Sequence, residues 1–146
     1  MKKNFILILG ILLFAEMCFA KDYKVDFEYS MLVKSGKGSS GKNESIAKVL
    51  NQSESSFNLI LPDFVFSEKM TIASFEIKDV EFKKDENGNV FFSKEKFSSN
   101  NGKYEISGNN LNGRILNNGE IEFSVSYKAG KMPFKLNVKY SGKEIL

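Results

Sequence analysis

The stretch 119–142 near the end of the chain alternates apolar and polar residues in two runs. One face of the first run carries Ile121, Phe123, Val125 and Tyr127. One face of the second carries Phe134, Leu136, Val138 and Tyr140. A period of two indicates half-buried β-strands, because successive side chains of a strand point to opposite faces. A polar, glycine-containing link lies between the runs, and Pro133 stands at the start of the second, where a missing N–H is tolerated. We therefore predict a β-hairpin.

The same alternation predicts strands in the first half of the chain. Residues 23–33 alternate over their whole length, and the runs 45–50 and 56–61 flank a polar turn, which predicts a second hairpin. Residues 70–82 alternate with two breaks, at 73–74 and 78–79, and such breaks predict β-bulges or bends. A helix is the competing interpretation of this last stretch, but its β-branched and aromatic residues favour a strand.

Polar segments rich in glycine and asparagine separate these runs. The Asn87-Gly88 pair predicts a tight hairpin turn, because both residue types accept positive φ. Residues 98–102, 108–110 and 112–113 are interpreted as further loops or turns, as is the segment 117–119. We expect the Gly/Ser/Lys-rich segment 34–43 to be a mobile loop. Eight to ten short strands with polar turns are typical of a β-sandwich or β-barrel.

The N-terminus has the pattern of a secretory signal peptide. Two lysines precede an apolar run at 5–14, and small residues then stand at the −3 and −1 positions of a cleavage site after Ala20. The apolar run is short for a membrane anchor. Cys18 could carry a lipid, but the glutamate and methionine before it disfavour this. We predict a signal peptide at 1–20, one β-barrel domain at 21–146, and an extracytoplasmic location, either periplasmic or secreted.

Composition limits the chemistry of the mature chain. The sequence has no histidine, and its single cysteine lies in the signal segment. Ser-His-Asp and Cys-His catalysis and the usual zinc, copper and haem ligands are thereby excluded. The carboxylates Asp26 and Glu28 alternate with apolar residues, so we place them on a solvent face. We predict no enzymatic activity, no catalytic residues, no metal and no cofactor.

The charge of the mature chain gives no indication of a nucleic-acid partner. Removing residues 1–20 leaves 19 Lys and Arg against 17 Asp and Glu, a net charge of +2 compared with +3 for the full chain. Arg114 is the only arginine, whereas phosphate recognition generally relies on several guanidinium groups. We predict no nucleic-acid binding and no membrane span after signal removal.

The order of four segments resembles a known family. They are the apolar strand and aromatic pair at 58–66, the interrupted strand and Asn-Gly turn at 70–92, the segment 102–113, and the hairpin 119–142. Together they resemble the calycin-like β-barrel family of exported bacterial proteins, which is related to the lipocalins. The resemblance implies an all-β fold, an antiparallel, closed or nearly closed up-and-down barrel of about eight strands. It implies no catalytic residues.

Two functions fit such a barrel. In the first, the protein is a monomer that holds a small apolar ligand inside the barrel, lined by Phe27, Tyr29, Phe57, Phe123, Tyr127, Phe134 and Tyr140. In the second, these side chains fill the interior, and the loops 34–43 and 62–69 bind a protein partner. Exposure of Phe64 and Phe66 would support this function, and the alternative is that both are buried as a plug on one end of the core. An outer-membrane barrel would need longer middle strands than the sequence offers, so we prefer a soluble barrel.

Overall fold

The computed structural model describes residues 20–31, 35–38, 45–67 and 70–145. The predicted signal peptide falls outside these residues except for Ala20, which begins the first strand. The mature domain boundary and the cleavage after Ala20 therefore stay predictions.

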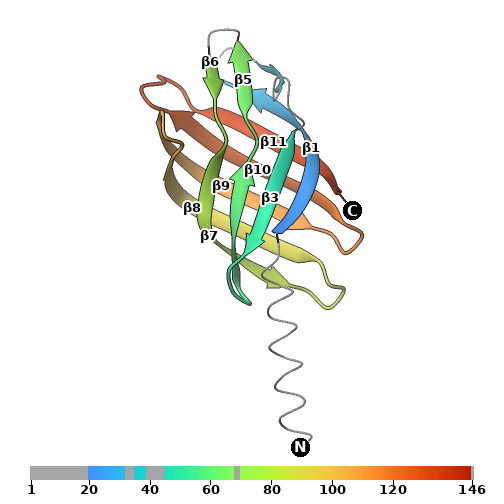
Figure 1. Ribbon diagram of the computed structural model, residues 1–146. Coiled ribbons are helices and arrows are strands. Elements are labelled where there is room, and N and C mark those ends of the chain that lie inside the picture. Colours follow the sequence, from blue (N-terminus) through green and yellow to red (C-terminus); the bar gives the residue numbers. More distant parts are fainter. Residues whose placement is uncertain (1–19, 32–34, 39–44, 68–69, 146) are drawn as a thin grey trace, which may run out of the picture.

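The domain is a closed antiparallel barrel of eight strands (Figure 1). In spatial order the strands are β1 (Ala20–Ser30), β3 (Ile46–Asn51), β4 (Ser56–Leu61), β7 (Phe75–Lys84), β8 (Val90–Asn100), β9 (Glu105–Ile115), β10 (Glu120–Ala129) and β11 (Leu136–Glu144). Each strand pairs with the next in this order, and β11 pairs with β1 to close the barrel. The predicted fold class and the two predicted hairpins are confirmed.

One end of the barrel is covered by a short hairpin of β5 (Phe64–Ser67) and β6 (Met70–Ile72), seen at the top of Figure 1. The ring of Phe64 is 1% exposed and packs 5.5 Å from the ring of Phe27 and 5.4 Å from that of Tyr29, measured between centroids. Of the two alternatives for Phe64, burial at one end of the core is confirmed and exposure for a partner is wrong.

The strand β2 (Ser35–Lys37) corrects the prediction of a mobile loop at 34–43. It pairs with Glu28–Ser30 of β1, and the N–H of Gly38 donates to the carbonyl of Phe27. Backbone hydrogen bonds, which leave no trace in the side-chain pattern, hold this strand. Residues 34 and 39–43 of the predicted loop lie outside the described residues.

Aromatic rings fill the middle of the barrel. Consecutive ring centroids lie 4.6–6.0 Å apart along the chain of contacts Phe57, Phe92, Phe123, Tyr140 and Phe27. Aliphatic side chains of every barrel strand except β8 are buried around these rings. The interior at this level is therefore a packed core of the kind found in small barrels.

The strand β9 runs unbroken through two segments that were predicted as turns, 108–110 and 112–113. A Cβ atom at position 113 would lie 2.5 Å from Cζ of Phe92, so a glycine is needed to admit this ring into the barrel. Asn110 has a φ of 54° at a β-bulge, where the pairing of β9 with β10 shifts register. The glycine and asparagines therefore serve ring packing and a bulge within the strand.

One predicted bulge is confirmed, and two predicted strand boundaries are corrected. The predicted bulge at 78–79 is confirmed by a register shift opposite Asn58 and by a φ of 56° at Asp79. The predicted loop 98–102 is wrong at its start, because β8 continues to Asn100. The last strand begins at Leu136, so Phe134 belongs to the preceding connection.

Candidate functional site

The barrel end opposite the β5–β6 hairpin holds a cup of about 660 Å³. It is surrounded by the β3–β4, β7–β8 and β9–β10 turns, together with the start of β1 and the end of β11. The turn after β7 is fixed by the carboxylate of Asp85, whose Oδ1 accepts the N–H groups of Asn87 and Asn89 at 2.9 Å each. The wall of the cup is therefore built from ordered turns.

The floor of the cup is apolar. It is formed by inward-facing side chains at the ends of six strands, namely Tyr23, Val49, Phe57, Phe82, Val90 and Ile115. Tyr23 is the polar exception: burial, and to a smaller degree the Glu144 carboxylate, raise the pKa of its phenol to about 12. The hydroxyl is therefore protonated at neutral pH and can donate a hydrogen bond to an occupant of the cup.

The rim of the cup is polar and carries a net positive charge. It is lined by Lys21, Lys84 and Glu144, together with Asn51 and Asn117. The ammonium of Lys21 lies 3.9 Å from Oε1 of Glu144, an exposed and weak contact. Within the described ranges Lys84 forms no ion pair. An apolar floor below an unpaired cation suits an amphipathic anion.

Comparison with known proteins identifies the fold. The sequence profile of the Calycin-like beta-barrel domain matches residues 20–143. The chain belongs to this calycin-like family. A solved structure from Bacteroides fragilis, of a protein provisionally named an outer membrane protein, superimposes with a TM-score of 0.64 at 18% identity. The match covers 84% of this chain and 49% of that one, so the chain spans about half its length. No curated protein matches the sequence.

Five of the seven side chains predicted to line the calycin-like barrel are buried inside it. They are Phe27, Phe57, Phe123, Tyr127 and Tyr140. Only Phe57 reaches the cup, because the others pack against one another in the filled middle of the barrel. Their predicted role in ligand binding stays untested.

The two remaining predicted residues lie elsewhere. Tyr29 is half-buried beneath the β5–β6 hairpin. Phe134 is 42% exposed and does not line the interior, because it precedes the last strand and its alternation with Leu136 does not extend into the connection. Placing Phe134 inside the barrel was therefore wrong.

Several cup residues were not predicted. Tyr23 shares the inward face of β1 with Phe27, so its parity could have indicated it. Lys84 and Glu144 stand at strand ends, where a charged residue normally faces solvent. Lys84 lies two positions after Phe82, and Glu144 lies four positions after Tyr140, so each shares the inward face of its strand. This spacing in the sequence could have indicated both residues.

The buried hydroxyls of Tyr127 and Tyr140 satisfy each other at 3.1 Å in the core. Burial raises the pKa of both phenols well above the usual value. Neither side chain has any exposed surface. These hydroxyls therefore stabilise the core and do not face the cup.

Among the described residues, no helix is long and apolar enough to cross a membrane.

Proposed function

We propose that this calycin-like barrel is an exported, non-enzymatic protein that binds a small amphipathic anion in the cup at its open end. The observation that carries the proposal is the pairing of an apolar floor with the unpaired Lys84 at the rim. The signal-peptide pattern supports an extracytoplasmic location, as does the provisional name of the Bacteroides fragilis neighbour.

The filled middle of the barrel restricts which ligand can bind. Phe57, Phe92 and Phe123 block the axis, so a long chain cannot pass through the barrel. The volume of about 660 Å³ lies within the range of small-molecule sites. The proposed ligand therefore places a medium-length apolar tail on the floor and a carboxylate or similar head group at the rim.

Burial and charge act at different parts of such a ligand. Each methylene that leaves water for the floor contributes about 0.8 kcal/mol. The head group interacts with Lys84 at the rim. The tail is thus the main source of affinity, and the rim selects the sign of the head group.

Decanoate is expected to bind, and decyltrimethylammonium, with an equal chain and opposite charge, to bind at least about tenfold more weakly. Replacing Val90 with tryptophan should abolish decanoate binding, because Val90 lines the cup and the larger ring fills it. Lys84→Glu should weaken decanoate binding. It should also reduce the difference in affinity between decanoate and decyltrimethylammonium. Isothermal titration calorimetry with protein produced from the full chain measures all three effects.

The matched control is Ser93→Trp, an equally large substitution on the exposed outer face of the same strand. It should bind decanoate as the unmodified protein does. Unchanged binding in Val90→Trp, or equal affinity for both head groups, would contradict the proposal.

A further inference from the structure

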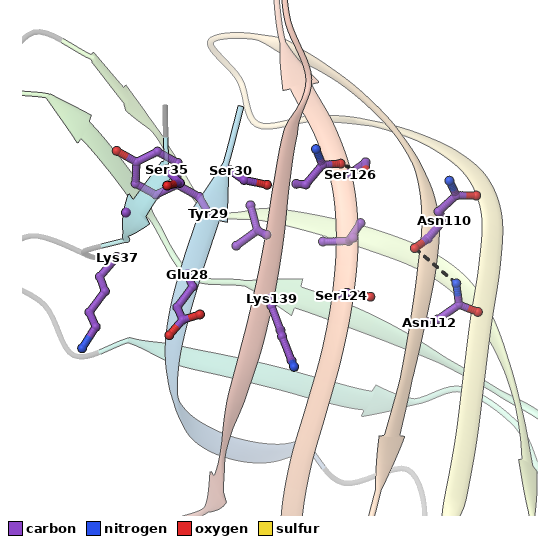
Figure 2. Close-up of a pocket in the computed structure, with 14 residues that line it drawn as sticks. Glu28, Tyr29, Ser30, Ser35, Lys37, Asn110, Asn112, Ser124, Ser126 and Lys139 are labelled. Atoms are coloured by element: carbon purple, nitrogen blue, oxygen red, sulfur yellow. Dashed lines mark hydrogen bonds between the residues drawn. The ribbon is translucent and has the colours of Figure 1, made fainter. Parts of the chain in front are cut away.

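A second hollow lies on the outside of the barrel, where the outer faces of β9, β10, β11, β1 and β2 meet (Figure 2). This outer groove has a volume of about 860 Å³ and is distinct from the cup. Figure 2 shows its labelled side chains projecting from neighbouring strands rather than from one loop. The strand pairing therefore fixes their spacing.

The groove residues form rows across the strands. One row is in register from β9 to β2, as Asn112, Ser124, Lys139, Glu28 and Lys37. The next row contains Ser126, Asn137, Ser30 and Ser35, and it continues on β9 at Asn109, which does not line the groove. Five strands about 4.8 Å apart give each row a length of roughly 19 Å. The site is therefore long enough for a chain of several small units.

Most polar groups in these rows have no partner in the described part of the chain. Ser126 donates a hydrogen bond to Oδ1 of Asn137, and Asn112 donates to the carbonyl of Asn110. The hydroxyls of Ser30, Ser35 and Ser124 make no such bond, and Glu28 forms no ion pair with Lys37 or Lys139. Donors and acceptors are thus open to a ligand.

The residue types differ from those of an ordinary solvated strand face. Asparagine is depleted in β-strands, yet Asn110, Asn112 and Asn137 all stand within strands at the groove. The bulge at Asn110 bends β9 beside the groove. The short serine and asparagine side chains leave the groove hollow beside the longer side chains of Glu28, Lys37 and Lys139.

An aromatic ring lies at one edge of the groove. Phe91 is 46% exposed and lines an adjoining hollow of about 280 Å³. The two hollows share Asn112, Ser124 and Lys139, so they lie side by side. An exposed ring beside amides and hydroxyls matches a sugar, whose ring has one apolar C–H face and a periphery of hydroxyls.

We propose that the outer groove binds a neutral oligosaccharide of several sugar units. Hydroxyls of the ligand would exchange hydrogen bonds with the serines and asparagines of both rows, and one sugar ring would stack on Phe91. Glu28 stands between Lys37 and Lys139 in its row, so the charges alternate and favour a neutral ligand over a polyanion. An apolar ligand would leave the polar rows without partners.

Titration calorimetry with cellotetraose, maltotetraose and mannotetraose tests the proposal on protein produced from the full chain. At least one of these tetrasaccharides is expected to bind with a Kd below about 1 mM. Ser124→Lys places a long side chain at the groove centre and should weaken that binding at least about tenfold. Phe91→Ala should weaken it about fivefold to tenfold through loss of stacking.

Ser98→Lys is the matched control, since Ser98 is exposed on β8 and does not line either hollow. This control should bind the tetrasaccharide normally, and all three variants should bind decanoate in the cup as before. Failure of all three neutral tetrasaccharides to bind would overturn the proposal, as would normal binding by Ser124→Lys. Tighter binding of the anionic tetragalacturonate would overturn the assignment to a neutral ligand. Loss of decanoate binding with normal tetrasaccharide binding would contradict only the proposed function of the cup.

Discussion

Replacing Gly142 with alanine is expected to lower the free energy of unfolding by about 3 kcal/mol or more. A Cβ atom at this position would lie 1.9 Å from the carbonyl oxygen of Lys24 and 2.8 Å from Cα of Val25. Both are backbone atoms, so no side-chain rotation relieves the clash. Gly142 pairs with Val25 where β11 meets β1, and the substitution therefore opens the seam that closes the barrel.

Urea unfolding monitored by tyrosine fluorescence measures this effect. Ser141→Ala is the matched control, because Ser141 is the exposed neighbour of Gly142 on the same strand. It should change the free energy of unfolding by no more than about 0.5 kcal/mol. An average point substitution lowers the free energy of unfolding by about 1 kcal/mol. If Gly142→Ala lowers it by no more than this, the result would contradict the close approach of the two backbones.

Alkaline pH is expected to unfold the protein steeply. Burial raises the pKa of Tyr127 and Tyr140 above the usual value near 10, so both phenols stay protonated in the folded state after they have ionised in the unfolded state. The stability that the two buried phenols contribute is fully present below pH 10, and it is lost as the pH rises toward their pKa in the folded state. Each phenol lowers the free energy of unfolding by about 1.4 kcal/mol per pH unit in this window. A stability of about 5 kcal/mol would be lost roughly two units above pH 10.

Urea unfolding at a series of pH values from neutral to strongly alkaline tests this expectation. The double variant Tyr127→Phe with Tyr140→Phe removes both hydroxyls and should lose much of the alkaline slope. At neutral pH it should remain near the stability of the unmodified protein, because the paired groups leave together. Tyr140→Phe alone should cost about 1–3 kcal/mol, because the Tyr127 hydroxyl then lacks its partner. An alkaline slope that is equal in the double variant and the unmodified protein would contradict the role of this pair.

Alternation predicted the long strands because one face of each is buried. Residues 121–127 and 23–29 show this directly, and their inward side chains lie in the barrel as expected. The strand β2 could not be predicted, since Ser35, Gly36 and Lys37 carry no apolar residue and are held by backbone pairing. Gly113 was mistaken for a turn residue, because the sequence does not reveal that the ring of Phe92 lies over it.

The candidate sites depended more strongly on the closed barrel. Phe57 and Phe123 have the same pattern in the sequence, yet Phe57 borders the cup and Phe123 is enclosed by other rings. The two residues differ in their position along the barrel axis, and strand register determines that position. The groove likewise collects Ser30, Ser124 and Asn137 from distant parts of the chain, and only the pairing of β10, β11 and β1 brings them together.

The sequence by itself determined an all-β domain with a signal-peptide pattern, and it excluded histidine- and cysteine-based chemistry from residues 21–146. Those conclusions rest on local periodicity and composition, which need no long-range contacts. Only the tertiary structure decided that aromatic rings fill the middle of the barrel while one end stays open, and that polar rows form a groove outside. The reason is physical: alternation fixes which face a side chain takes, whereas barrel closure and register fix which other side chains share its level.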